Sequence, residues 1–285
     1  MNNSDSSDTG FQAAIQAIDA GNIGELKKLL ERDQRLVGHR LSEPEEGYFQ
    51  RPYLLWFIAD NPIRHKKLPS NIVDITALLI ETIKQEAPSL LKEQLDYTFE
   101  LVITGSVARD CGCQIALMNL LMREGVKPHG QLGALAHGNL EAAAYLVKHG
   151  APLTLSTAIG LDYMDAIPAL MHSSTASERQ IALIVASFFG RPVTVEQLIN
   201  RGVDVNTYIN ASSGFHYHAT ALHQAVYAGS IEAVKLLVHA GADVNLRDKL
   251  YDGTPLDWAI YMQKETKDLV LLMNYKEIED FLKTC

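Results

Sequence analysis

The sequence is poor in cysteine, and it has no apolar run long enough to cross a membrane. Its 285 residues include only Cys111, Cys113 and Cys285, an odd number that fits a reducing compartment better than a disulfide framework. A membrane-spanning helix needs about 20 apolar residues. The polar start MNNSDSSDTG lacks the basic end and apolar core of a secretory signal. We therefore expect a cytoplasmic protein without membrane contact, and a disordered tail over residues 1–10.

Concentrated basic charge and known catalytic motifs are missing as well. The formal net charge is -9, which argues against nucleic acid as a partner because phosphate contacts need a basic face. The chain has no G-x-S-x-G elbow, P-loop, H-E-x-x-H pair or glycine-rich dinucleotide turn. Cys111-Gly112-Cys113 is only half of a zinc site. We expect no metal, no cofactor and no catalytic residue.

The most informative segment is TALHQAVYAGSIEAVKLLVHAGADVNLRDKLYDGTPLDWA, residues 220–259. Thr220 stands at the N-cap of a short helical pattern, and Gly229 ends that pattern where the chain reverses. A second helical pattern then runs to Gly241, with apolar residues at helical spacing at Ile231, Val234, Leu237 and Val238. Asp243 follows it in a segment whose side chains favour turns.

The spacing of these glycines recurs earlier, at Gly190 and Gly202 and at Gly138 and Gly150. The pattern resembles the ankyrin-repeat family, strongly over residues 178–259, fairly over 131–151 and by periodicity elsewhere. The resemblance implies an all-α solenoid of about seven to eight stacked helix pairs. In that family each unit has two antiparallel helices and a projecting loop, and the loops and first helices form a concave face.

We expect one solenoid over residues 11–285. Residues 11–127 form degenerate repeats, 129–173 form repeats that lack the projecting loop, and 178–285 form consensus-like repeats with a C-terminal cap. Two connections are long, residues 206–220 and the segment from Arg40 to Pro52. Long loops on a rigid scaffold are often functional.

The segment from Tyr208 to His218 is the first candidate for a binding site. It presents Tyr208, Phe215, His216, Tyr217 and His218 around a Ser-Ser-Gly hinge, and aromatic residues are enriched in binding hot spots. Alternatively, Phe215 and Tyr217 fold back and cover the core. His216 and His218 lie near His223 but lack a carboxylate or cysteine to complete a metal site. The resemblance implies that His223 bonds to neighbouring loops.

Six further residues lie on the same side in the family geometry and complete the partner-binding set: Gln224, Tyr227, Lys249, Tyr251, Asp252 and Tyr261. Trp258 is either a groove contact or packing under the last loop, and we favour packing. Trp56 and Phe57 lie in a uniformly apolar run and are expected in the core. Asp204 and Asp243 occupy equivalent positions and are expected to be turn residues.

These observations favour a non-catalytic interaction module, a monomer that binds a protein or peptide through its concave face and long loops. Two alternatives stay open. One is an enzyme, or a regulatory subunit of one, with a site in the divergent N-terminal third. The other is a protein that assembles with its own copies. Perturbed titratable groups in a pocket would indicate an enzyme, whereas exposed aromatic residues on the groove side would indicate a binding module.

Overall fold

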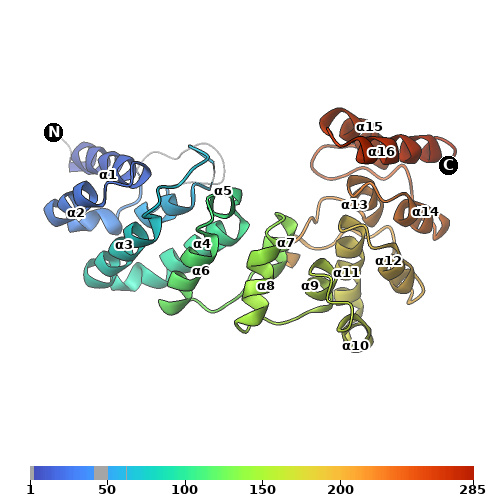
Figure 1. Cartoon of the computed structure of the whole chain (residues 1–285), viewed down its shortest axis with the longest axis horizontal. Coiled ribbons are helices and arrows are strands. Elements are labelled where there is room, and N and C mark those ends of the chain that lie inside the picture. The colour runs from blue at the N-terminus through green and yellow to red at the C-terminus, as the bar shows by residue number, and fades with distance from the viewer. Residues whose placement is uncertain (1–2, 42–50, 62) are drawn as a thin grey trace. The chain divides into compact units, whose positions relative to one another are not determined.

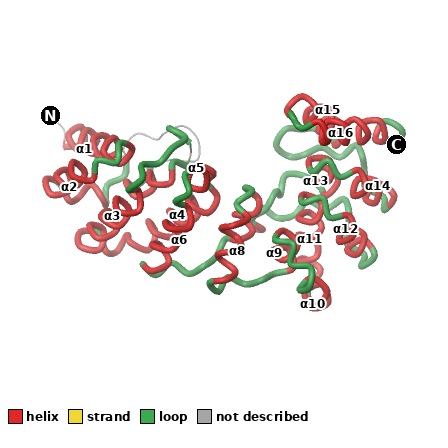
Figure 2. Tube along the Cα trace, in the orientation of Figure 1, coloured by secondary structure: helices red, strands yellow, loops and turns green. Residues whose placement is uncertain are grey.

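The computed structural model describes residues 3–41, 51–61 and 63–285, and within them every regular element is helical apart from an isolated bridge between Arg40 and Tyr53. Figure 2 shows helices joined by loops. The predicted all-α class is confirmed. The chain divides into two compact units, residues 1–151 and 152–285. The single solenoid expected from the sequence stays a prediction, and each unit is described by itself.

The first unit stacks helix pairs in two layers (Figure 1). One layer holds α1 (Asn3–Asp19), the 3-10 helix η2 (Leu54–Ala59), α4 (Leu91–Thr104) and α7 (Gln131–Ala136). The other holds α2 (Ile23–Arg32), α3 (Ile72–Glu86), α6 (Gln114–Arg123) and α8 (Leu140–Lys148). The short elements between them are η1 (Gln34–Val37), η3 (Pro88–Leu90) and α5 (Ser106–Asp110).

The start of the first helix differs from the sequence prediction, and one predicted connection lies mostly outside the described residues. Helix α1 begins at Asn3, within the predicted tail, and its buried Phe11, Ala14 and Ile18 anchor it to the unit. Residues 1–2 lie outside the described part. So do residues 42–50, most of the connection from Arg40 to Pro52. Trp56 and Phe57 are buried in η2, as expected.

The second unit repeats the two-layer arrangement. One layer holds α9 (Leu155–Gly160), α11 (Ala176–Phe188), α13 (Ala221–Tyr227) and α15 (Pro255–Glu265). Their partners are α10 (Ile167–Ser173), α12 (Pro192–Ile199), α14 (Ile231–His239) and α16 (Leu269–Leu282). A short 3-10 helix, η4 (Ala211–Ser213), lies in the connection before α13.

Local chemistry explains where the helices of this unit begin and end. The Thr220 and Thr254 hydroxyls cap α13 and α15, and each cap is closed reciprocally by the side chain three residues later. Gly229 and Gly241 adopt left-handed backbone angles, with φ of 64° and 91°, which suits a residue without a Cβ at a helix end. A side chain at Gly229 would also meet Leu271 at 3.0 Å. These sequence signals therefore fix the reversals between helices.

The connections between helices vary in length. Helix α7 follows α6 after residues 124–130, and α9 follows α8 after residues 149–154, so these repeats lack a projecting loop. Residues 200–220 and 240–254 are much longer connections, and both lead into helices of the same layer. The two long loops therefore stand beside α13 and α15, where the candidate site is found.

Candidate functional site

A groove lies on the second unit where α11, α13 and α15 meet the two long connections. Its volume is about 660 Å³. We call it the aromatic groove because rings make up most of its wall. It is lined by Phe188, His216, His218, Gln224, Tyr227, Tyr251, Gly253, Asp257, Trp258, Tyr261 and Met262.

The groove is built from equivalent positions of successive helices. Four residues after the N-cap stand Gln224 in α13 and Trp258 in α15, and three residues further stand Tyr227 and Tyr261. Phe188 precedes Gly190 by the same two residues that separate Tyr227 from Gly229. Because residues three apart lie on one face of a helix, the repeat brings these side chains to the same side.

Phe188 is the centre of the ring packing on one side of the groove. Its ring stacks on Tyr227 with centroids 5.3 Å apart, and it lies 4.8 Å from the His216 ring. Phe215 meets Phe188 edge to face at 5.2 Å. Edge-to-face and stacked pairs are the favoured aromatic arrangements. The pairing fixes the loop before α13 against the end of α11.

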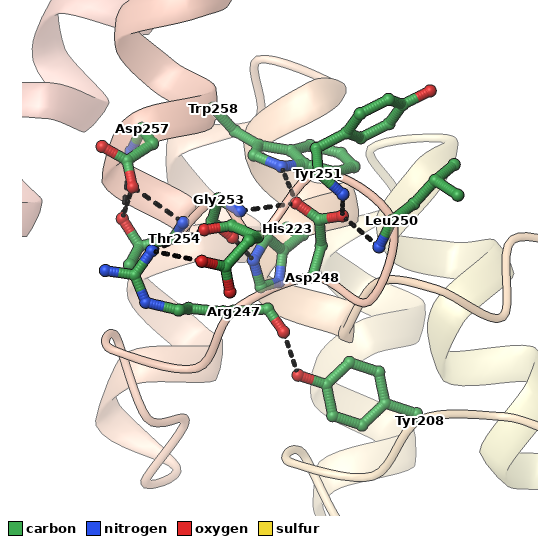
Figure 3. A network of polar contacts seen from close by, with 11 residues as sticks. Tyr208, His223, Arg247, Asp248, Leu250, Tyr251, Gly253, Thr254, Asp257 and Trp258 are labelled. Atoms are coloured by element: carbon green, nitrogen blue, oxygen red, sulfur yellow. Dashed lines mark hydrogen bonds and ion pairs between the residues drawn. The ribbon is translucent and has the colours of Figure 1, made fainter.

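The buried carboxylate of Asp248 organises the loop on the other side (Figure 3). One of its oxygens accepts the N–H groups of Leu250 and Tyr251 at 2.9 and 2.7 Å. The other accepts the Gly253 N–H at 3.0 Å and the Trp258 indole N–H at 2.9 Å. Burial alone would raise the pKa of Asp248, but these hydrogen bonds outweigh it and hold that pKa below its usual value.

His223 joins this loop to helix α13. Its Nδ1 lies 2.8 Å from the Thr220 hydroxyl, and its Nε2 lies 3.0 Å from the Gly253 carbonyl oxygen, so Nε2 carries the proton that is donated there. Burial lowers the pKa of His223. Burial also lowers the pKa of His218, against the opposing charge of Asp248. A neutral His223 therefore has the loop-bridging role that the family resemblance implies.

Six of the predicted partner-binding residues come together in the aromatic groove: His216, His218, Gln224, Tyr227, Tyr251 and Tyr261. Tyr227, Tyr251 and Tyr261 are 43%, 73% and 59% exposed. Gln224, by contrast, is only 2% exposed. The partner-binding role of this set stays a prediction.

The other five predicted residues lie outside the groove lining. The Tyr208 hydroxyl donates to the Arg247 carbonyl at 2.6 Å, and Lys249 Nζ lies 4.2 Å from the centre of the Tyr208 ring. Asp252 pairs with Arg247 at 3.5 Å. Tyr208 and Lys249 thus join the two long loops, whereas the Asp252–Arg247 pair lies within the second of them.

The aromatic pair at the tip of the 206–220 connection is split by burial. Phe215 is 4% exposed, because its ring packs edge to face on Phe188. The prediction of Phe215 as a surface contact is therefore corrected. Tyr217 is 45% exposed. The alternative in which the loop covers the core therefore holds for Phe215 but not for its neighbour.

Four lining residues were missed: Phe188, Gly253, Asp257 and Met262. Phe188 stands two residues before Gly190, as Tyr227 stands two residues before Gly229, and this spacing would have identified Phe188. Asp257 has the sequence position of a helix-capping residue, so its place in the groove wall was not expected. Hydrogen bonds from the Thr254 backbone N–H and hydroxyl lower the pKa of Asp257. Trp258 both packs under the last loop and lines the groove, so the two alternatives for it are not exclusive.

A second hollow, of about 490 Å³, lies in the first unit beside Tyr97, Glu100 and His137. Its buried acid, Asp60, is held by the N–H groups of Arg64 and Lys66 at 3.0 and 2.9 Å. Burial raises the pKa of Tyr97. The Asp60 carboxylate therefore shapes a turn.

Metal-binding clusters and membrane-spanning helices are both absent from the residues that the structure describes. No three His, Cys, Asp or Glu side chains there gather closely enough to hold a metal ion. No helix there has the length and apolar character needed to cross a bilayer.

Comparison with known sequences decides the family. A family model described as "Ankyrin repeats (3 copies)" matches residues 114–248 and 213–280, more than half of the chain. The chain belongs to the ankyrin-repeat family. Ankyrin repeats are protein–protein interaction modules, and the predicted family and all-α ankyrin-repeat fold class are confirmed.

Relatives match a limited part of this ankyrin-repeat chain. Human "Ankyrin repeat and SOCS box protein 6" is 37% identical over 78 residues, which cover 27% of this chain and 17% of the relative. Mouse "Protein phosphatase 1 regulatory subunit 12A" is 40% identical over 84 residues, which cover 29% of this chain and 8% of the relative. The chain thus matches less than a fifth of either relative's length.

Among solved structures, the human ASB11 ankyrin repeat domain is similar to this chain with 15% sequence identity and a TM-score of 0.34. The match covers 92% of this chain and 96% of that domain.

Proposed function

We propose that this protein is a non-catalytic interaction module that binds a protein or peptide partner through the aromatic groove. The observation that carries the proposal is the exposure of Tyr227, Tyr251 and Tyr261 around one concave site. Exposed tyrosines beside an apolar pocket are typical of binding hot spots. The groove also lies on the first-helix and loop side, the surface that ankyrin repeats present to partners.

The groove is preformed, which favours binding of a flexible partner. Asp248 and His223 tie the 240–254 loop to α13 and α15 by hydrogen bonds from backbone and side-chain groups. A site that is already ordered loses little conformational freedom on binding, so more of the contact energy appears as affinity. We place this binding activity in the cytoplasm.

A peptide-display selection against the immobilised protein tests the proposal. Peptides enriched on the wild type should lose binding to a Tyr227→Ala/Tyr261→Ala variant. The matched control is Tyr163→Ala, which removes an exposed tyrosine of the same unit outside the groove. Peptides that bind all three proteins equally would show that the aromatic groove is not the binding site, and the proposal would be rejected.

Self-assembly is a second candidate, because one observation favours it. On α16, Leu269, Val270 and Met273 are 75%, 68% and 71% exposed. Leu269 and Met273 lie one turn apart, so they share a face of the helix. If this face mediates assembly, sedimentation will show a mass above 31.5 kDa that Met273→Glu returns to the monomer. A concentration-independent monomer would support the interaction module instead.

A further inference from the structure

Gln224 is a buried residue whose side-chain Nε2 has no hydrogen-bond partner in the described structure. Its side chain is 2% exposed and lines the aromatic groove. Among the residues that the structure describes, none accepts a hydrogen bond from its Nε2. Buried polar groups almost always have a partner in native structures. A donor without one, at the wall of a groove, therefore indicates that a bound molecule supplies an acceptor.

Comparison with the equivalent position of the next repeat shows that the unpaired donor is particular to Gln224. Trp258 occupies the equivalent position in the next repeat, and its indole N–H donates to Asp248 at 2.9 Å. The Trp258 donor is thus satisfied within the fold, whereas the Gln224 donor one repeat earlier is not. The main-chain carbonyl of an extended peptide is a suitable acceptor, because every residue of a peptide carries one.

The charges around the groove favour a positively charged side chain on that peptide. The lining contains Asp257 but no lysine or arginine. Behind Trp258 lies the buried Asp248, whose hydrogen bonds in the described structure all come from neutral donors. A carboxylate held by neutral groups keeps its full negative charge, and a partly desolvated site strengthens its field.

The nearby cations are engaged elsewhere. Arg247 bonds to the backbone and carboxylate of Asp252, although it also contributes weakly to lowering the pKa of Asp257. Lys249 lies over the Tyr208 ring. No positive charge therefore stands in the groove lining to repel a cationic guest.

The aromatic rings of the groove also favour a cation. Aromatic faces attract cations through their negative quadrupole, most strongly for tryptophan and tyrosine. Trp258, Tyr227 and Tyr261 line the groove together with the acidic Asp257. A guanidinium group stacks on aromatic faces and is weakly hydrated, which makes arginine better suited to such a site than lysine.

We propose that the aromatic groove binds an arginine side chain of an extended peptide segment, while Gln224 Nε2 donates a hydrogen bond to a carbonyl oxygen of that segment. The proposal rests on the function proposed above and names the chemistry of the partner. It assigns recognition of charge to the rings and acid, and recognition of the main chain to the amide.

The test uses the full-length ¹⁵N-labelled protein and the peptide acetyl-Ala-Gly-Arg-Gly-Ala-amide at millimolar concentration. The chain has two tryptophans, so the Trp258 indole resonance reports on the groove and the buried Trp56 indole serves as an internal control. The arginine peptide should shift the Trp258 resonance saturably and leave Trp56 unchanged. Replacing arginine by citrulline, which has the same shape without the charge, should weaken binding about fivefold or more.

Two variants separate the parts of the proposal. Gln224→Met keeps the length of the side chain but removes the donor, and should weaken binding about threefold or more while the folded spectrum is retained. Tyr163→Ala, which removes an exposed tyrosine of the second unit away from the groove, should bind as the wild type does. Gln224→Met binding as tightly as the wild type would overturn the role of the amide.

The failure of this inference differs from the failure of the proposed function. Equal binding of the arginine and citrulline peptides, or no shift of the Trp258 resonance by either, would overturn the cation site. Display-selected peptides that need Tyr227 and Tyr261 but carry no arginine would overturn it too, while the groove would remain a binding site. Selected peptides that ignore those tyrosines would reject both.

Discussion

The neighbouring aromatic residues Phe215 and Tyr217 should respond oppositely to truncation. Phe215 is 4% exposed and packs edge to face on Phe188, whereas Tyr217 is 45% exposed. Removing a buried phenylalanine side chain costs about 3–5 kcal/mol in protein cores. Because Phe215 stands on a loop that can relax, we expect about 3 kcal/mol for Phe215→Ala, and within about 0.5 kcal/mol of zero for Tyr217→Ala.

Urea unfolding followed by Trp258 fluorescence measures both changes. A Trp56→Phe background assigns the signal to the second unit, because the chain has only these two tryptophans. The free energies of unfolding of the two variants are compared with that of the background protein. A loss below about 1 kcal/mol for Phe215→Ala, or an equal loss for both variants, would refute the reasoning from burial.

Three further predictions concern the core, a buried acid and a buried histidine. Leu237→Ala should lower the free energy of unfolding by about 2–5 kcal/mol, because Leu237 is fully buried. Trp258→Phe should raise the pKa of Asp248, measured by NMR titration, because it removes one of that carboxylate's donors. Burial lowers the pKa of His223 in the folded state, so unfolding takes up a proton, and the stability present above pH 6.5 is lost as the pH falls below it. Urea titrations at several pH values should show a smaller loss in His223→Gln, and an identical pH dependence would contradict the assignment.

Most of the helical scaffold was predictable because its determinants are local. Thr220 caps the helix that follows it, and Gly229 adopts the left-handed backbone that ends it. Each of these residues acts within about one helical turn of itself, so the sequence pattern is sufficient to place it. The family match over residues 114–280 rests on the same pattern.

The groove was only partly predictable. The helical spacing places Tyr227 and Tyr261 on the same side, and Phe188 could have been found from its equivalent distance to Gly190. The role of Asp248 was not readable, because an acidic residue in a turn usually faces solvent. Asp257 has the spacing of a helix-capping residue, which does not show that it also lines the groove. Only the fold shows that the Asp248 carboxylate accepts a hydrogen bond from the indole N–H of Trp258, ten residues further along the chain.

Sequence by itself therefore determined the repeat, the helix ends and the side on which the aromatic residues stand, since these follow from short-range spacing and backbone conformation. Tertiary structure decided which of those residues are free to bind. Phe215 and Tyr217 are two residues apart and alike in sequence, yet one is buried and the other exposed because Phe188, in the preceding repeat, packs on only one of them. The unpaired amide of Gln224 is likewise a property of its neighbours. Burial depends on contacts between repeats, and no local pattern specifies them.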